Sequence, residues 1–562
     1  MAEVRCHRRY PPFLGGKLIR RELGNGYVDS LFENLGERVP AEADLCCYWF
    51  EKARQQIEHG KCKRAGLLAT QGIRGGANRE VLKRIKNTGD IFFAESSRDW
   101  ILAGANVHVS MVGFDDGTES NRSLNGQAES VIHANLSAES ADITAAKPLA
   151  ANCDIAFMGD TKGGSFDITE PQAIEMLCKP NPHGHPNSNV VLPWVNGLDV
   201  TRRTREMFIV DFGVGMSQAA SSQYESPFNY VLRVVKPERD KSRSTVGVWW
   251  QHERARPDMR EILEPLPRFI ATVAVSKHRL FVWLEAPTQP DHAVFAFARA
   301  DDYFFGVLHS RLHEVWALKL GTRLETRPRY TPTTCFETFP FPFADDLQLP
   351  VAVAGKKSKP DSGWDEVMEK RFYTLKEEPP AYHAAGSSRR EAHSSSPGNG
   401  QSLVTSAATK DQHRAAIAAA AEELNELRER WLNPPEWTIE SLLKFPGSAD
   451  GPWSRYIHKP NKEGIGTVRY PRLEPRDADC AAKLKDRTLT KLYNERPAWL
   501  DLSHKRLDAA VAAAYGWPAD LSDEQILEKL LALNLARAAA ESKAAKVKKP
   551  KTSREKNADE MI

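Results

Sequence analysis

The chain has 562 residues, 41% of them hydrophobic, which is enough for several domains with apolar cores. Its 77 lysine and arginine residues nearly balance its 74 aspartate and glutamate residues, so the net charge of +3 excludes a uniformly basic nucleic-acid binder and allows only local basic clusters. The eight cysteines are scattered and form no Cys-x-x-Cys pair, which argues against a zinc site and against a disulfide framework. The sequence shows no signal peptide and no membrane-spanning run, which predicts a cytoplasmic protein.

The first motif is Tyr10-Pro11-Pro12-Phe13, followed by two glycines. Each proline fixes its own φ angle and restricts the residue before it, so the run predicts a rigid turn that presents an aromatic ring. Such runs also occur in ordinary turns. The run resembles motif IV of amino-methylating DNA methyltransferases, in which Asn, Asp or Ser precedes Pro-Pro-aromatic.

The resemblance to motif IV implies catalytic roles for Tyr10, Pro11, Pro12 and Phe13. In that motif a side-chain acceptor and a proline-fixed carbonyl bind the amine of a flipped base, and the aromatic ring stacks on the base. Tyr10 departs from the pattern, because a phenol cannot replace the carbonyl acceptor of Asn or Asp.

Residues 15–118 show alternating helix and strand patterns. Helices are predicted at 27–37, 43–59 and 79–87, and strands at 64–70, 90–94 and 107–114. A glycine-rich turn, Gln71–Asn78, joins the first of these strands to a helix, an order typical of half of a doubly wound α/β sheet. We therefore expect 64–70 to be a buried parallel strand. Gly75 and Gly76 fit a plain turn equally well.

Residues from about 140 to 345 show short strands separated by turns. Ala156–Phe166 predicts a strand with a tight glycine turn, and Asn189–Thr201 and Phe208–Asp211 predict further short strands. Asp211-Phe-Gly-Val-Gly215 superficially matches the glycine loop that binds the methyl donor, and a circularly permuted methyltransferase would place that loop here. His309 and His313 lie four apart on a predicted helix, but no Glu follows His309, so we predict no metal site.

Basic residues of this region cluster in predicted loops and are interleaved with aromatic residues. Loops of this kind can hold phosphates and read guanine edges. The predicted DNA-binding residues are Arg202, Arg203, Lys277, His278, Arg279, Arg323, Arg327, Arg329 and Tyr330. Because the net charge is low, we expect only about a third of the clustered basic residues to contact DNA, the others being solvated charges.

The last third of the chain divides by composition. Residues 346–410 are rich in Ser, Gly and Pro and predict a disordered linker. Helix patterns between 411 and 541, including the capping box Ser522-Asp-Glu-Gln525, predict a helical C-terminal module. Residues 542–562 form a lysine-rich tail, which fits a solvated end or a weak contact with the DNA backbone.

Several strings occur in the order found in the MmeI-like DNA methyltransferases, which are large restriction–modification enzymes. They are Pro11-Pro-Phe-Leu-Gly-Gly16, Glu42-Ala-Asp-Leu45, Gly66-Leu-Leu-Ala-Thr70, Asn196-Gly-Leu-Asp199, Tyr303-Phe-Phe-Gly-Val-Leu-His-Ser310 and Phe339-Pro-Phe-Pro342. The chain therefore resembles the C-terminal portion of an adenine-N6-specific enzyme of this family that uses S-adenosylmethionine. The resemblance implies a partial Rossmann-like methyltransferase sheet in residues 1–135, a mixed α+β target-recognition domain in 140–345, and the helical module in 411–541.

In this family the donor-binding loop (motif I) precedes motif IV, and only nine residues precede Tyr10. We therefore expect a truncated enzyme, explained by a shifted or interrupted reading frame, in which no cofactor-binding residue can be named. Two alternatives stay open. One is a non-catalytic subunit that binds a specific site in double-stranded DNA, alone or with a chain that supplies the donor-binding half. The other is a remnant without function. No nuclease motif is visible.

Overall fold

The structure is a computed structural model that describes residues 11–102, 105–138, 142–241, 248–324, 327–343 and 403–547. The chain forms two units, residues 1–347 with 413–562, and residues 348–412. Most of the predicted linker and the tail after residue 547 lie outside the described residues, although helix α13 already begins at Leu403. In the described ranges, no helix combines the length and apolarity needed to cross a membrane.

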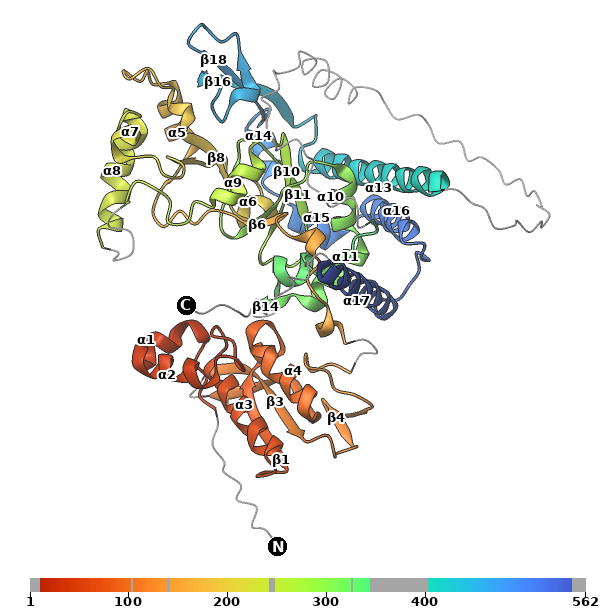
Figure 1. The fold of residues 1–562 in the computed structure, drawn as a ribbon. Helices are drawn as coiled ribbons and strands as arrows, with labels where there is room; N and C mark the ends of the chain where they lie inside the picture. Colours follow the sequence, from red (N-terminus) through yellow and green to blue (C-terminus); the bar gives the residue numbers. More distant parts are fainter. Residues whose placement is uncertain are drawn as a thin grey trace, which may run out of the picture. The chain divides into compact units, whose positions relative to one another are not determined.

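The first part of the chain forms a five-stranded sheet with strand order β1-β3-β2-β4-β5 (Figure 1). The strands are β1 (Arg64–Thr70), β2 (Asp90–Leu102), β3 (Ala105–Asp115), β4 (Arg122–Leu124) and β5 (Gln127–Glu129). Both β1 and β2 pair antiparallel with β3, so they run parallel to each other. Helix α4 (Arg79–Thr88) connects these two parallel strands.

The expectation that residues 64–70 form a buried parallel strand is wrong. Within the described part of the chain β1 is hydrogen-bonded only to the antiparallel strand β3, and along it only Leu68 and Ala69 are buried. The short connection from β2 to β3 reverses the chain direction, as a hairpin must, and β3 lies between the two strands that α4 joins. An apolar run predicts a strand but does not specify the partner of that strand.

The helices predicted at 27–37, 43–59 and 79–87 are confirmed as α2 (Asn25–Leu35), α3 (Leu45–Glu58) and α4. The short helix α1 (Ile19–Leu23) was not predicted. The apolar side of α3 packs on the sheet, where the rings of Phe50 and Phe114 stack with centroids 6.0 Å apart. Val81, Leu82 and Ile85 of α4 are buried in the same core.

Two four-stranded sheets form the middle of the chain, with strand orders β11-β10-β13-β6 and β12-β8-β9-β7. Their strands are β6 (Ala156–Met158), β7 (Asp167–Ile168), β8 (Val191–Val195), β9 (Phe208–Val210), β10 (Arg268–Val273), β11 (Phe281–Glu285), β12 (Gln289–Pro290) and β13 (Val294–Phe297). The accompanying helices are α5 (Glu170–Cys178), α6 (Gly197–Thr201), α7 (Gln218–Ser222), α8 (Glu225–Arg239) and α9 (Pro257–Leu263). The strand predicted at 208–211 corresponds to β9, and the one predicted at 189–201 is a strand only over β8, because residues 197–201 form helix α6.

The Tyr303–Ser310 string forms helix α10 (Asp302–His309), and helix α11 (Arg311–Leu320) follows it directly. The antiparallel strands β14 (Thr322–Leu324) and β15 (Arg327–Arg329) come next. Asp301 caps α10 by accepting a hydrogen bond from the Phe304 N–H at 2.9 Å. The rings of Phe339 and Phe341, from the Phe-Pro-Phe-Pro string, are fully buried against these helices.

The C-terminal helices share one core with this middle region. They are α13 (Leu403–Leu432), α14 (Ala478–Leu484), α15 (Leu489–Glu495), α16 (Ala498–Ala514) and α17 (Asp523–Val547). A methyl group on Gly306 of α10 would lie 2.8 Å from Ile417 of α13 and 3.2 Å from Leu507 of α16. The glycine of the Tyr-Phe-x-Gly string therefore allows three helices to meet.

The C-terminal segment also contains strands that the sequence analysis did not predict. The sheet β16-β18-β17 is made of β16 (Thr438–Ser448), β17 (Ile457–His458) and β18 (Ile465–Pro475). The helical module expected at 411–541 is thus interrupted by an antiparallel sheet. Short 3-10 helices lie at Gly16–Leu18, Gln71–Arg74, Gly76–Asn78, Ile143–Ala145, Ala150–Asn152, Asn187–Asn189 and Ser454–Tyr456, and a π-helical turn lies at Pro332–Phe336.

Candidate nucleic-acid interface

The Pro-Pro-Phe motif forms a turn at the beginning of the described chain. Pro11 is buried, Pro12 is exposed and Phe13 is half-buried. The Leu14 N–H donates to the carbonyl of Pro12 at 3.2 Å, which closes the turn. Tyr10, the residue at the acceptor position, lies outside the described residues.

Gly16, the second glycine after this motif, is held by Asp44, which is in turn bonded to Asn78. The Gly16 N–H donates to Oδ1 of Asp44 at 3.0 Å, and the side chain of Asn78 donates to Oδ2 at 2.8 Å. In return the Asp44 N–H donates to Oδ1 of Asn78 at 2.7 Å. A Cβ atom at Gly16 would lie 2.1 Å from the carbonyl oxygen of Glu42, so only glycine fits here. The Asp44–Asn78 pair therefore fixes the motif loop to the N-terminal ends of α3 and α4.

A second set of predicted residues gathers on what we call the basic surface, made of Arg202, Lys277, His278, Arg327 and Arg329. His278 is half-buried and the other four are exposed. Arg327 and Arg329 are two residues apart on β15 and so lie on the same face of the hairpin. Arg323 lies on β14, opposite Pro328; its side chain falls outside the described part of the chain.

Helix α15 links the parts of the basic surface. The Thr490 hydroxyl donates to the carbonyl of Thr201, beside Arg202, at 2.8 Å. At the other end of α15, Oδ1 of Asn494 lies 2.5 Å from the Lys277 ammonium and 2.9 Å from Nε2 of His278. The Ser276 N–H, next to Lys277, contacts the carbonyl of Pro328 on β15 at 3.4 Å. The end of α6, α15, the 276–278 loop and the β14–β15 hairpin are thus neighbours.

Arg279 and Tyr330 cannot contact DNA, because both side chains belong to the core. Arg279 is 7% exposed and donates to the carbonyl of Val273 at 2.6 Å, and its guanidinium lies 4.8 Å from the centre of the Tyr330 ring. Burial lowers the pKa of Arg279. Tyr330 is 1% exposed, and its hydroxyl lies 3.1 Å from Nε2 of His313.

Arg203 also has a structural partner. Its guanidinium donates to the carbonyl of Leu432, at the end of α13, at 2.9 Å. Burial lowers the pKa of Arg203. The interaction ties the α6 region to the C-terminal segment, so this arginine is less available to DNA than its neighbour Arg202.

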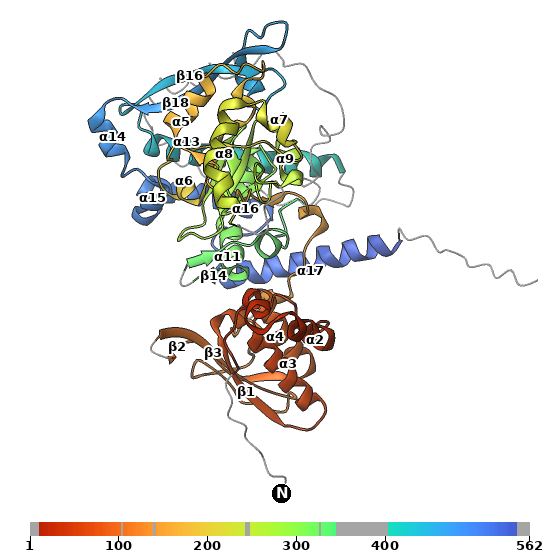
Figure 2. The ribbon, with the colours of Figure 1, turned by 90° about the vertical axis from the view of Figure 1, so that its left-hand side faces the viewer.

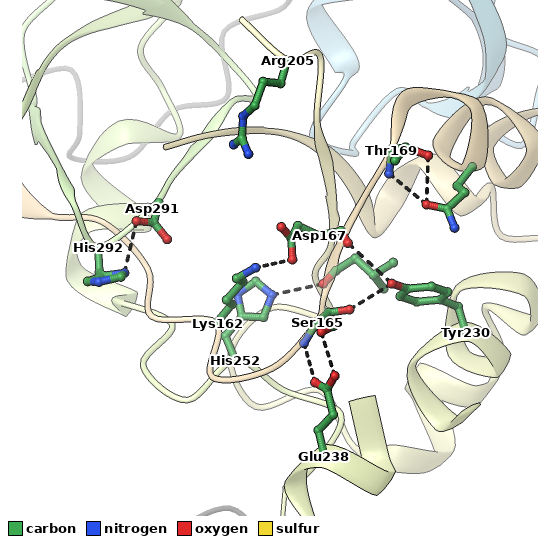
Figure 3. Close-up of polar contacts among 12 residues, drawn as sticks. Lys162, Ser165, Asp167, Thr169, Arg205, Tyr230, Glu238, His252, Asp291 and His292 are labelled. Carbon is green, nitrogen blue, oxygen red and sulfur yellow. Dashed lines mark hydrogen bonds and ion pairs between the residues drawn. The ribbon is translucent and has the colours of Figure 1, made fainter. Parts of the chain in front are cut away.

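The glycine turn predicted within 156–166 is present and is held by α8 (Figure 3). Ser165 donates its N–H and its hydroxyl to the carboxylate of Glu238 at 2.9 and 2.8 Å, and the Tyr230 hydroxyl donates to the carbonyl of Ser165 at 3.0 Å. Lys162 forms an ion pair with Asp167 across the turn. Gly163 has a φ of +66°, a left-handed conformation that favours glycine.

A buried cluster of charged residues lies beside this turn, and the sequence analysis did not predict it. Nδ1 of His252 lies 3.2 Å from Oδ2 of Asp160, and Nε2 of His252 lies 3.1 Å from the carbonyl of Val210. Arg260 of α9 donates to Asp211 at 2.5 Å and also to Asp160. Burial raises the pKa of Asp211, but Arg260 and His252 outweigh this effect and the pKa is lowered.

Ligand atoms of Asp160, Asp211 and His252 lie within 4.8 Å of one another, a spacing that could hold a metal ion. The guanidinium of Arg260 already bonds both carboxylates, so each of them has a positively charged partner within the protein. The Asp211 carboxylate also accepts the Gly213 N–H at 2.9 Å and is buried among these partners, so it is not open to the ribose of a methyl donor. We therefore interpret the cluster as a buried ion-pair network rather than as the donor loop of a permuted enzyme.

The other candidate metal ligands also have structural partners. His313 is fully buried, with Nδ1 2.9 Å from the carbonyl of Leu308 and Nε2 3.1 Å from the Tyr330 hydroxyl. Nε2 of His309 lies 2.8 Å from Nη1 of Arg428, which comes from α13. Arg428 was not singled out in the sequence, because only its 1% exposure in the folded chain distinguishes it from the other arginines of that helix.

Comparison with known proteins gives two matches. Residues 267–343 match the family described as MmeI, target recognition domain. Over 94% of its length the chain also matches the fold of the type IIL restriction–modification enzyme MmeI in complex with DNA, with a TM-score of 0.60 and 16% sequence identity. None of the curated proteins matches. The predicted resemblance to the MmeI-like enzymes is confirmed, and the chain spans 57% of the length of that enzyme.

Proposed function

We propose that this chain recognises a specific site in double-stranded DNA as part of a restriction–modification enzyme. The observation that carries the proposal is the position of the basic surface. Four of its five residues, Lys277, His278, Arg327 and Arg329, lie within the 267–343 segment that matches the MmeI target recognition domain. Exposed arginines on a short hairpin can reach base edges in a groove, and neighbouring cations can bind phosphates.

The test replaces Arg327 and Arg329 together by glutamine. We expect the double variant to lose about 10- to 100-fold of the preference for the selected site over random DNA, because a bidentate arginine–guanine contact contributes about 1–3 kcal/mol of discrimination. The site is first obtained by selection from a randomised duplex library with the native chain. Dissociation constants for the selected and random duplexes are then compared at one salt concentration.

The control for this test is Arg311→Gln. Arg311 lies outside the basic surface and forms an ion pair with Asp523 at 2.6 Å. It should leave the preference for the selected site unchanged. A native chain that selects no site from the library would contradict the proposed function. A preference that survives in the Arg327/Arg329 variant would instead contradict the role of the hairpin.

We further propose that residues 1–135 are the second half of an adenine-N6 methyltransferase domain that uses S-adenosylmethionine. The proposal is supported by the Pro-Pro-Phe turn, its Asp44–Asn78 anchor, and the parallel strands β1 and β2 joined by α4. In this proposal the sheet is part of a Rossmann-like one, and none of its described residues forms a donor-binding loop. Transfer would then require a second half that carries this loop. The competing proposal is a non-catalytic DNA-binding subunit.

Methyl transfer from tritiated S-adenosylmethionine to mixed-sequence plasmid DNA distinguishes these two proposals. We expect no label on DNA from the native chain or from Tyr10→Asn alone. With the donor-binding half of an MmeI-like enzyme added, label should appear, and more of it with Tyr10→Asn, because asparagine supplies the amide carbonyl that a phenol lacks. Label from the native chain alone would show that it holds a donor site. Persistent absence of label would favour the non-catalytic subunit.

A further inference from the structure

The strands β16 and β18 form a long antiparallel ribbon outside the 267–343 segment. They pair residue by residue from Thr438↔Pro475 to Ser448↔Ile465 and lie side by side in Figures 1 and 2. One face of the ribbon is covered, because Phe445 and Val468 pack with Trp453 in the core that also contains β8 and β9. The opposite face is open to solvent.

Two cations lie directly opposite each other on the open face. Lys444 of β16 is the register partner of Arg469 of β18, and both are exposed. Like charges at directly opposed positions destabilise a strand pair. Within the described ranges neither side chain forms an ion pair that would relieve the repulsion. A bound anion would relieve it.

The surroundings of the Lys444–Arg469 pair are also basic. Residues 444–469 contain five lysine and arginine residues against two acidic residues, whereas the whole chain carries only +3. His458 lies on the same face, since it is the partner of Thr467, and Lys459 follows it in an exposed turn. The open face thus carries Lys444, Arg469 and His458, with one carboxylate, Glu440, farther along it.

The ribbon is fixed to the part of the chain that carries the basic surface. The Trp453 indole N–H donates to the carbonyl of Val191 on β8 at 3.2 Å, and Arg455 donates to the carbonyl of Pro265, just before β10, at 2.6 Å. A two-stranded ribbon has a width that the major groove of DNA accepts, and its cations can reach the phosphates that border the groove.

We propose that the open face of the β16–β18 ribbon binds the phosphate backbone of double-stranded DNA through Lys444 and Arg469. This inference rests on the proposed function, because the same duplex would contact the basic surface. The ribbon supplies affinity without sequence preference, and the basic surface supplies the preference.

The test is the double variant Lys444→Gln/Arg469→Gln, compared with the native chain on a labelled 40-base-pair duplex of random sequence between 50 and 200 mM KCl, roughly the range over which phosphate contacts change affinity strongly. Loss of two phosphate contacts should reduce the slope of log affinity against log salt by about 1.8. The preference for the selected site over random DNA should stay unchanged. Tryptophan fluorescence and circular dichroism check that the variant remains folded.

The matched control is Lys505→Gln/Lys543→Gln, which removes the same charge from exposed positions on α16 and α17. Its salt slope should equal that of the native chain. An unchanged slope in the ribbon variant, or an equal fall in the control, would overturn the proposal while site selection by the native chain still supports the proposed function.

Leu442 and Leu473 are exposed on the same face of the ribbon, so binding to a membrane surface is measured as well. The probe is vesicles with about 30% phosphatidylserine, which present a strongly anionic surface. If the native chain binds these vesicles, and the ribbon variant loses that binding but keeps its affinity for DNA, the proposal is also overturned.

Discussion

Lowering the pH from 7 to 5 is expected to destabilise the core around α10, α11 and α16 by about 4 kcal/mol. His309, His313 and His504 are buried there, and burial is the main cause of their lowered pKa values. The pKa falls to about 3 for His313 and for His504. An unfolded histidine has a pKa of about 6.5, so below that pH the unfolded chain binds protons that the folded chain does not.

The sign of the effect follows from this difference. Stability contributed by a lowered histidine pKa is complete above pH 6.5 and is lost as the pH falls toward the folded pKa. Each histidine costs about 2 kcal/mol by pH 5. Asp508 acts in the opposite direction, because burial raises its pKa to about 6 and it takes up a proton in the folded state first. It offsets a little over about 1 kcal/mol, and Glu314 of α11, whose pKa burial also raises, acts in the same direction, so the net loss is about 4 kcal/mol at most.

Urea unfolding followed by tryptophan fluorescence at pH 7, 6 and 5 measures this loss. In His504→Phe the slope of the unfolding free energy against pH should fall by the contribution of one histidine, because a group with a lowered pKa has been removed. His183→Asn is the control, because His183 is exposed. Its removal should not change the slope. A midpoint that is the same at pH 7 and pH 5 in the native chain would contradict the role of the buried histidines.

The sequence predicted local structure well where a periodic pattern decides it. The helical spacing of Leu45, Trp49, Ala53 and Ile57 predicted helix α3, although of these four only Leu45 and Ile57 are buried and Trp49 is 40% exposed. Strand pairing was not predictable in the same way. The partner of β1 is set by the β2–β3 hairpin, and β16 pairs with β18 across the intervening residues 449–464. Neither partner is encoded in the strand itself.

The candidate site divides along the same line. Residue type identified Arg327, Arg329 and Lys277 as cations in loops or hairpins, and the folded chain leaves them exposed. The same reasoning also selected Arg279, which is buried in the folded chain. Residue type cannot show this, because burial depends on which strands and helices surround a residue. The Arg260 cluster was missed since Asp160 and Arg260 are a hundred residues apart. A lone arginine in a sequence gives no sign that it will bridge two carboxylates.

Arg260→Met is expected to destabilise the sheet β12-β8-β9-β7 and its surroundings by about 3–5 kcal/mol. In the native chain Arg260 bonds Asp160 and Asp211, whose side chains are 0% and 2% exposed. Without the guanidinium, two carboxylates remain in the interior with only His252 beside them. Burying an unpaired charge costs far more than the net contribution of a well-formed pair. The loss is measured as a shift of the urea midpoint at pH 7.

Zinc ions provide the control that identifies what the cluster holds. In Arg260→Met the ligand atoms of Asp160, Asp211 and His252 are free of the guanidinium, and two carboxylates with one imidazole form a donor set that zinc accepts. Added ZnCl2 should therefore restore part of the stability of the variant and leave the native chain unchanged. Arg260→Met/Asp211→Asn should also recover stability, because it removes one buried charge. If EDTA lowers the stability of the native chain, the cluster holds a metal ion and the role assigned to Arg260 is wrong.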